Sequence, residues 1–460
     1  MTEMPVYSTP LIMFFAVILL AFLAGVIIVN IKIHFLFALI LGLAFIFISF
    51  LNIQYGLVTL VFSMLLSPEI PLAQLPGRSV VVRYDDFILL ALFVVWLVHM
   101  AIRKEMALFV RTPINRQIFI YTLICVLFTA RGIVLGYIKP VKSFFYLLKY
   151  IEYFILFIMT ANIVRDTRQV KHLLIAGLIT FIIVNLYGYT LIGRVGRIYA
   201  PFDFDPVSGT GESASLGGYL LIVMSVLLGL FCYAPTTKYA ILFMGLFVFA
   251  LPTLAYTFSR ASFFAFIPMC MSVVLLAQKR KLLLIMIFIT GLLFSPILFP
   301  KPTQDVLGRI QETFAGTDEQ TAVGGIRVRE ASALARVESW KKAFFVWLPR
   351  EPLMGHGLTG VGLVDTMFPL ILGETGIVGL LAFIWLMYSV GKNAIKIFNT
   401  IDDWLAKGLA LGLFSALIAL IFQSVAVNTF IIIRIMGPFW FLTAIVLRLP
   451  EIYTIRGKKL

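Results

Sequence analysis

Apolar stretches close to 20 residues long are the feature of this sequence that most limits the folds it can adopt. A helix needs about 20 apolar residues to cross the hydrocarbon layer of a bilayer. Of the 460 residues, 61% are hydrophobic and 13% are charged, whereas soluble domains have roughly 45–50% apolar and 25% charged residues. A water-soluble fold is therefore excluded. Because the stretches lack the period-two alternation of outer-membrane strands, we expect a helical membrane protein.

We expect an all-α polytopic membrane protein of about 14 transmembrane helices, with a large extracytoplasmic loop that carries an amphipathic helix. Residues 1–299 would hold helices 1–11, residues 300–365 the extracytoplasmic loop, and residues 366–460 helices 12–14 and a cytoplasmic tail. The first span precedes many others, which favours a retained helix over a cleaved signal. The spans are predicted at 10–30, 33–51, 54–67, 86–102, 117–130, 143–164, 172–192, 215–234, 239–258, 261–278, 282–299, 366–391, 405–427 and 430–448.

Basic residues in the connectors predict the orientation of the chain. One alternate set of short connectors carries 18 Lys and Arg residues, and the other set carries 9. Lys and Arg concentrate on the cytoplasmic side of membrane proteins. The set of connectors richer in Lys and Arg is therefore predicted to be cytoplasmic, which places both termini in the cytoplasm. The net charge of +15 includes no Lys/Arg run typical of a nucleic-acid arm, so nucleic acid is not an expected partner. Cys125, Cys232 and Cys270 lie in apolar stretches and predict neither a disulfide framework nor a metal cluster.

The predicted outer side holds the irregular connectors, over 68–85, 193–214 and 300–365. Loops of this length inside a compact protein are usually functional or disordered. The polar first half of the last connector is expected to be mobile or loosely helical. Its second half predicts an amphipathic helix, because five apolar residues recur at spacings of 3 and 4. These residues are Ala333, Val337, Trp340, Phe344 and Trp347.

Such a helix suits the membrane–water interface, and an anchor without chemistry is its simplest interpretation. The arginine distribution favours a further role, because the outer side carries 11 Arg and 6 Lys, against 8 Arg and 10 Lys inside. Arginine is planar and always charged, and it binds phosphate through two parallel hydrogen bonds. An outer excess therefore indicates a phosphorylated ligand in the outer leaflet, with chance as the alternative. Arg260 stands out because it joins two apolar helices with almost no loop, where a charge usually faces a cavity or a partner.

Several other charges within or beside the spans have two interpretations each. Lys149 and Glu152 are three residues apart in one span and predict a structural pair on one helix face, in preference to a substrate contact. Arg434 would either bind a ligand or neutralise Glu374.

Two neighbouring carboxylates, Asp85 and Asp86, open a span on the outer side. They would cap that helix or counter the charges of Arg78 and Arg83, and capping is the simpler interpretation.

Short motifs in the second half of the chain resemble the O-antigen ligase and Wzy-type O-antigen polymerase superfamily. The sequence has R-x-x-x-W over 336–340, P-x-x-G-x-G over 352–357 and E-T-G-x-x-G-L over 374–380. Ser259-Arg260-Ala261 matches the S-R-G/A element of that family, and Asp85-Asp86 matches its acidic start of an early span. The motifs of this resemblance lie within 256–380, and the rest of the chain resembles the family only in its arrangement of spans.

The resemblance implies a GT-C-type glycosyltransferase of the bacterial inner membrane, with its active site in the 300–365 loop facing the periplasm. Such proteins move a glycan from an undecaprenyl-diphosphate carrier to an acceptor hydroxyl, without a nucleotide sugar, a metal or another cofactor. The two functional arginines of the family carry over onto Arg260 and Arg336, which would hold the diphosphate. Guanidinium donors in a site of low dielectric constant stabilise the negative charge that develops on this leaving group. Asp203 and Asp205 are the nearest pair of outer carboxylates, and they are expected to cap a helix or to bind sugar hydroxyls.

The sequence departs from the family where the ligases carry a histidine. Asp365 occupies that position, nine residues before Glu374, and His356 is the only histidine nearby. Either side chain would accept the proton of the attacking hydroxyl. The departure favours a polymerase of O-antigen or exopolysaccharide repeat units over a ligase with lipid A-core or protein as acceptor.

The expected partners are the undecaprenyl-diphosphate-linked glycan, membrane lipid, an acceptor glycan or lipid A-core, and a chain-length regulator. A lipid-linked oligosaccharide flippase is the alternative from another class, and it would also have about 14 spans. A flippase should carry charges along a central cavity, whereas these charges concentrate outside. Further residues expected to bind substrate are Arg194, Arg197, Arg329, Trp340, Arg434 and Glu374.

Overall fold

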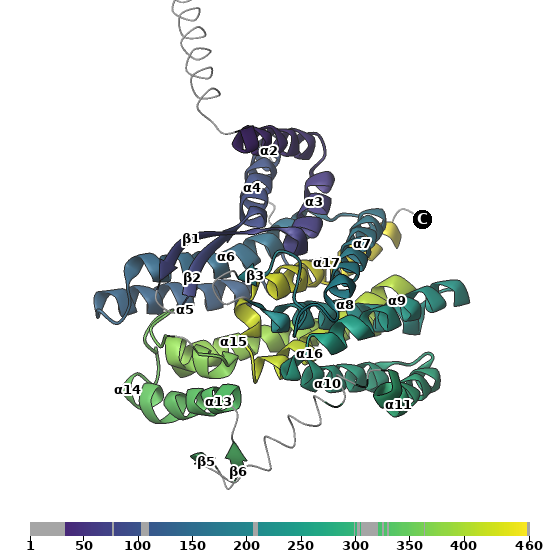
Figure 1. Ribbon diagram of the computed structural model, residues 1–460. Helices are drawn as coiled ribbons and strands as arrows, with labels where there is room; N and C mark the ends of the chain where they lie inside the picture. Colours follow the sequence, from purple (N-terminus) through teal and green to yellow (C-terminus); the bar gives the residue numbers. More distant parts are fainter. Residues whose placement is uncertain are drawn as a thin grey trace, which may run out of the picture.

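Helices make up most of the protein in the computed structural model (Figure 1). The structure describes residues 33–457 except 76–77, 103–109, 206–209, 299, 301–303, 305–320, 324–325, 329–330 and 363. The first half contains α2 (Ile33–Leu51), α3 (Ile53–Leu66), α4 (Tyr84–Ile102), α5 (Asn115–Val134), α6 (Pro140–Ile163), α7 (Thr167–Leu191) and α8 (Ser213–Tyr233). The second half contains α9 (Thr237–Tyr256), α10 (Arg260–Leu276), α11 (Lys281–Leu298), α13 (Ala331–Lys342), η1 (Ala343–Trp347), α14 (Leu348–Arg350), α15 (Met367–Thr400), α16 (Trp404–Ser424), η2 (Thr429–Ile431) and α17 (Ile433–Gly457).

Nine of the helices in the described part of the chain are long and apolar enough to cross a membrane. The protein is therefore a polytopic, multi-pass membrane protein, as the sequence predicts. The shorter apolar helices Gly42–Leu51, Ile53–Leu66, Arg260–Leu276 and Lys281–Gly291 coincide with further predicted spans. The predicted span over 10–30 lies outside the described residues. The nine long helices are α4, α5, α6, α7, α8, α9, α15, α16 and α17.

Contacts at the ends of the helices join residues that are predicted to lie on the same side of the membrane. On the predicted outer side, Arg131 at the end of α5 binds Glu351 in the connector before α15. On the predicted cytoplasmic side, Gln54 hydrogen-bonds His172 at 3.1 Å, and the Tyr453 hydroxyl donates to Asp403 at 2.5 Å.

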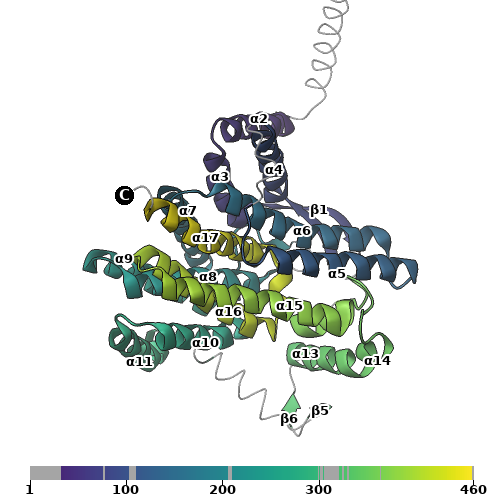
Figure 2. The same cartoon turned by 180° about the vertical axis from the view of Figure 1, so that it is seen from behind.

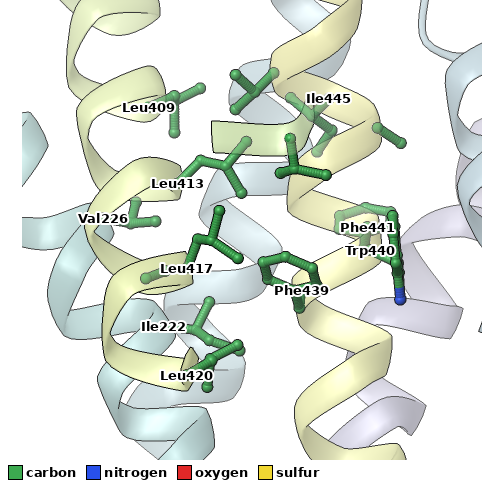
Figure 3. Packing of buried hydrophobic residues seen from close by; sticks show 14 of the residues in the cluster. Ile222, Val226, Leu409, Leu413, Leu417, Leu420, Phe439, Trp440, Phe441 and Ile445 are labelled. Atoms are coloured by element: carbon green, nitrogen blue, oxygen red, sulfur yellow. The ribbon is translucent and has the colours of Figure 1, made fainter. Parts of the chain in front are cut away.

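Helix α8 lies at the centre of the bundle, and almost all of its residues are buried. It packs between α16 and α17, where leucine, isoleucine and aromatic side chains interdigitate (Figure 3). Glycines allow the backbones of α8 and α16 to approach closely, because a Cβ on Gly229 would lie 2.2 Å from the carbonyl oxygen of Gly408. A helix buried on all sides explains why this span has no polar face.

Three short hairpins correct the expectation of irregular outer connectors. Strand β1 (Glu69–Leu75) pairs antiparallel with β2 (Arg78–Arg83), β3 (Phe204–Asp205) with β4 (Thr210–Gly211), and β5 (Thr321–Val323) with β6 (Ile326–Val328). The last pair lies in the segment that was expected to be mobile or loosely helical. That expectation overlooked a hairpin signal, since a Gly-Gly pair separates two short β-branched runs there.

Candidate functional site

The site predicted from the motifs is built around a break in α15. Gly376 interrupts this helix with φ 61° and ψ −165°. A break leaves carbonyl groups of the first half and amide groups of the second half without intrahelical partners. The connector over 351–360, which we call the glycine loop, satisfies the first half. The His356 amide donates to the Gly373 carbonyl at 3.0 Å, and the Gly357 amide donates to the Glu374 carbonyl at 2.8 Å.

The same loop also satisfies the second half of α15. The Ile377 amide donates to the Pro352 carbonyl at 2.9 Å, and the Val378 amide donates to the Leu353 carbonyl at 3.3 Å. The P-x-x-G-x-G and E-T-G-x-x-G-L segments are therefore one interlocked unit, held by backbone hydrogen bonds in both directions.

Glycine is required at two points of this unit. Gly355 has φ +65°, and a Cβ there would lie 2.6 Å from the carbonyl carbon of Glu374. A Cβ on Gly376 would lie 2.4 Å from the carbonyl oxygen of Leu353. Both the positive φ and the close approach of two backbones exclude a side chain at these positions.

The glycine loop is fixed to α5 and α6 by side chains. Arg131 donates to the Glu351 carboxylate at 2.8 Å and to the Gly355 carbonyl at 3.2 Å, and the Tyr137 hydroxyl donates to the other Glu351 oxygen at 2.9 Å. Partial burial raises the pKa of Glu351, but the hydrogen bonds from Tyr137 and Arg131 outweigh burial and hold this pKa below its usual value. Ser143 of α6 donates to the Leu358 carbonyl at 3.1 Å.

Glu374 faces a small cavity beneath the loop. Its side chain is buried, and the Thr359 amide donates to Glu374 Oε1 at 2.6 Å. The cavity lies between α6 and the first half of α15. Its lining includes Lys142, Tyr146, Tyr150, Thr359, Leu370 and Glu374.

Arg336 is half-buried on α13, and two residues on one side of it are buried. Ser339 and Ala343, three and seven residues further on, are 8% and 0% exposed. The Nε atom of Arg336 is shielded from solvent as well. The sequence predicts Arg336 on the polar face of an amphipathic helix, and in the structure Arg336 lies between the buried Ser339 and Ala343 on one side and the half-buried Trp340 on the other.

Phe344 and Phe345 of η1 are exposed, whereas Trp340 and Trp347 are half-buried. Trp340 stacks on Phe344 with ring centroids 5.7 Å apart, and Phe344 and Phe345 are 48% and 79% exposed. The backbone forms a π-helical turn over Ala343–Trp347, and Trp347 packs close to Gly373 of α15. Exposed aromatic rings are favourable in a membrane, because lipid accepts apolar side chains that water would not.

Arg260 is the first residue of α10 and stands on a buried polar network. The Ser259 side chain caps the helix, accepting from the Ser262 amide at 3.4 Å and from the Ser262 hydroxyl at 2.9 Å. Gln423 of α16 donates to the Ser262 hydroxyl at 3.1 Å and to the Ala214 carbonyl of α8 at 3.0 Å. Ser259, Ser262 and Gln423 are nearly or fully buried, so the start of α10 is held firmly.

This network was not predicted from the sequence, although a signal for it is present. Gly217 and Gly218 of α8 let the neighbouring helices approach, because a Cβ on Gly217 would lie 2.1 Å from the Ser262 hydroxyl oxygen. Two adjacent glycines inside an apolar span indicate such a close approach.

The helices that carry the two predicted catalytic arginines lie on the same side of the bundle. In both views the N-terminal end of α10 faces the start of α13, at the same level of the molecule (Figures 1 and 2).

The buried partner of Arg434 is Asp203, with which it forms an ion pair. Arg434 also donates to the Phe202 carbonyl at 3.1 Å. The predicted alternatives for Arg434 were a ligand or Glu374, so Asp203 is a partner that the sequence analysis missed. The side chains of Arg194 and Arg197 are exposed, and Arg197 donates to the Thr257 carbonyl at 3.2 Å.

The two candidates for the general base lie in different surroundings. Asp365 is exposed, immediately before α15. His356 is half-buried in the glycine loop, and its Nδ1 donates to the Gly373 carbonyl at 3.1 Å. The Nε2 atom is therefore the nitrogen of His356 that can accept a proton. Arg329, also predicted to bind substrate, lies outside the described residues.

A second group of charges joins α4 and α6. Arg83 pairs with Asp85 at 3.1 Å, and the Arg83 amide donates to the Asp86 carboxylate at 3.0 Å. Asp85 therefore counters Arg83, and Asp86 accepts from the backbone just before α4, whereas the Ser67 hydroxyl accepts from the Asp85 amide in the first turn at 2.9 Å. Lys149 pairs with Glu152 at 3.2 Å, as predicted, and with Asp86 at 2.6 Å.

Comparison with known proteins adds no assignment. No family model and no curated protein matches the chain. Within the described residues, His, Cys, Asp and Glu side chains form no group of three or more that could hold a metal ion. The geometry of the site is therefore the basis for a functional proposal.

Proposed function

We propose that this membrane protein is a glycosyltransferase that polymerises oligosaccharide repeat units linked to undecaprenyl diphosphate. The observation that carries the proposal is the position of Arg336 relative to the aromatic residues that follow it. The Arg336 Nε atom is shielded from solvent, and Phe344 and Phe345 in the continuation of the same helix are exposed, which supports a phosphate-binding group beside a lipid-facing surface.

Each arginine has a defined role in this mechanism. The hydroxyl oxygen of the acceptor attacks the anomeric carbon of the donor glycan, and the bond from that carbon to the diphosphate oxygen breaks. Arg336 and Arg260 bind the diphosphate and stabilise the negative charge that it gains. The start of α10 adds the partial positive charge of a helix N-terminus. Asp365 or His356 accepts the proton of the acceptor hydroxyl.

The proposal includes a full topology. The chain crosses a bacterial inner membrane about 14 times, with both termini in the cytoplasm and the 300–365 connector in the periplasm. The glycine loop and α13 then meet the donor lipid at the outer leaflet. With lipid A-core or a protein as acceptor in place of a lipid-linked repeat unit, the same site would act as a ligase.

Lysine substitution of the two arginines tests the proposal. Arg260→Lys and Arg336→Lys should each reduce polymer formation from purified lipid-linked repeat units by about 10²–10³-fold, since a point charge cannot make the two-pronged phosphate contact. Arg350→Lys, at an exposed arginine near the same helix, is the matched control and should retain activity.

Protein levels in the membrane must be equal, because a structural arginine would lower the amount of folded protein. Full activity in both lysine variants would exclude these residues from the site. Lipid-linked glycan transport without polymer formation would instead support a flippase.

A further inference from the structure

A groove between α7 and α17 lies apart from the proposed diphosphate site. In both views α3, α7 and α17 lie on one side of α8 and α16, whereas α10 and α13 lie on the other (Figures 1 and 2). The walls of the groove come from α3, α7, α8, α16 and α17. We call it the α7 groove and define it by Val170, Gly177, Tyr219, Val226, Leu409 and Phe441.

The α7 groove is almost entirely apolar and opens between two helices. Thr180 and Tyr219 are the lining residues that carry a hydroxyl, and the Thr180 hydroxyl donates to the Ala176 carbonyl of its own helix at 3.0 Å. Leu178 of α7 and Leu442 of α17 line the groove and are partly exposed, so the opening lies between these helices. Apolar cavities stay dry. Within a bilayer, hydrocarbon chains are the molecules available to fill this one.

The size of the α7 groove suits a single hydrocarbon chain. Its volume is about 100 Å³, whereas one water molecule needs roughly 10–15 Å³, so several methylene groups fit. Along α7 the lining runs from Val170 to Thr180, a length of about 15 Å. A transmembrane helix is about 10–12 Å wide with its side chains and is too wide to enter.

Gly177 leaves open space along the α7 wall. A Cβ at this position would meet no atom within 4 Å, although the residue lines the groove. Glycine destabilises a helix interior relative to alanine, and no close approach of another backbone requires it here. Its effect is therefore to widen the groove.

Tyr219 supplies one polar group to the wall. The residue is 3% exposed, and within the described part of the chain its hydroxyl makes no hydrogen bond. A hydroxyl that is removed from water without a partner is stabilised when a ligand supplies an acceptor. Tyr219 lies six residues, or about 9 Å, from the start of α8 at Ser213, and Val226 lies about two turns deeper. The acceptor is therefore expected at the end of the groove nearer the start of α8.

We propose that the α7 groove binds an acyl chain of a membrane phospholipid, with the Tyr219 hydroxyl donating to the ester carbonyl. An ester-linked phospholipid has a carbonyl acceptor joined directly to a long hydrocarbon chain. The isoprenoid chain of the proposed glycan donor carries oxygen only at its diphosphate, and the helices proposed to hold that diphosphate lie across the bundle. The inference does not depend on the proposed function.

Photolabelling in lipid nanodiscs tests this inference without turnover. The purified full-length protein is placed in phosphatidylethanolamine and phosphatidylglycerol, part of which carries a diazirine on one acyl chain, and labelled residues are mapped by mass spectrometry. Lipid on the outer surface cannot reach buried side chains. The readout is therefore the label on Ile222, Val226 and Leu409, which line the groove and are 2%, 5% and 2% exposed. We expect these residues to be labelled in the wild type.

Two glycines provide a matched pair of variants. Gly177→Leu places a side chain in the groove and should lower labelling of the buried residues at least about tenfold, equivalent to about 1.4 kcal/mol of binding. Gly245→Leu in α9 also meets no atom within 4 Å of its Cβ but lies outside the groove, so labelling should not change. Leucine favours helix over glycine, so thermal unfolding should show both variants to be folded.

The Tyr219 hydroxyl is tested with two lipids. Wild-type protein should label more strongly with the ester-linked diazirine phospholipid than with its dialkyl ether analogue, which lacks the carbonyl. Tyr219→Phe should reduce this preference about fivefold, the effect of one hydrogen bond. Tyr239→Phe, at an exposed position of α9 outside the groove, should leave the preference unchanged.

Three results would overturn the inference. The first is a wild-type protein without label on the buried lining residues, and the second is equal labelling of Gly177→Leu and Gly245→Leu. The third is displacement of the label by undecaprenol but not by unlabelled phospholipid, which would assign the groove to an isoprenoid chain. An ester preference that survives Tyr219→Phe would overturn the role of the hydroxyl.

Discussion

Lys149 lies between two carboxylates that belong to different helices. It is one turn from Glu152 on α6 and contacts Asp86 on α4. Within a bundle of apolar helices, a carboxylate that loses its counter-charge keeps its desolvation cost without the compensating attraction. Removing one partner of this ion pair is therefore expected to cost more stability than the intact pair contributes in net terms.

Removing the charge of Lys149 should destabilise the junction between α4 and α6. We expect Lys149→Met to lower the free energy of unfolding by roughly 2–3 kcal/mol, below the 3–5 kcal/mol of a fully buried pair, because 26% of the side chain is exposed. Thermal unfolding in detergent measures the effect. Lys149→Arg should retain most of the stability, and equal stability of the Met and Arg variants would contradict this role.

At the scale of single residues, the sequence predicted contacts that are local in the chain. The pairing of Lys149 with Glu152 follows from helical spacing. Its contact with Asp86 spans 63 residues, and no spacing rule predicts it. Arg434 illustrates the same limit, because its partner Asp203 lies in a connector whose path depends on the whole bundle.

At the scale of elements, α15 combines a predictable span with an unpredictable break. An apolar stretch predicts the helix, and its observed end at Thr400 lies well beyond the predicted end at 391. The break at Gly376 arises because the glycine loop replaces the missing helical hydrogen bonds, which is a tertiary effect. A π-helical turn over η1 continues α13, with Ala343 buried and Phe344 exposed.

Adding a methyl group at the break should disengage the loop. Gly376→Ala would force an alanine into φ 61° and place its Cβ 2.4 Å from the Leu353 carbonyl oxygen. We expect a loss of roughly 1–3 kcal/mol in stability and faster trypsin cleavage after Arg350, which precedes the loop.

Gly245→Ala in α9 is the control for this change, because nothing lies within 4 Å of a Cβ at that position. Alanine favours helix there, so this variant should be as stable as the wild type or slightly more stable. Unchanged cleavage and stability in Gly376→Ala would show that the loop does not depend on the break.

At the scale of the molecule, the charge bias of the connectors predicts which ends of the helices face the same side. It predicts neither the central position of α8 nor the interlock of the glycine loop with α15, because those depend on how glycines and backbone groups meet. Burial of the three native cysteines makes the orientation directly testable, since they should react little with an impermeant reagent.

Cysteine labelling in spheroplasts should distinguish the two sides. Arg350→Cys should react with an impermeant maleimide added from outside, because Arg350 is exposed at the proposed periplasmic end. Asp402→Cys should react only after lysis, because Asp402 lies at the proposed cytoplasmic end. The Asp402 side chain is 94% exposed, so a cysteine there is accessible to the reagent once the membrane is broken. Labelling of Asp402→Cys alone in intact spheroplasts would invert the topology and exclude a periplasmic site.

The exposed aromatic residues of η1 also have a consequence for the way the molecule sits in lipid. Phe344 and Phe345 favour the depth of the bilayer at which lipid headgroups meet acyl chains. Arg336 precedes Trp340 by four residues and Phe344 by eight, so it lies close to these rings along the helix and its height above the midplane follows theirs. Insertion of these rings into the interface would therefore fix the depth of the Arg336 guanidinium relative to the bilayer surface.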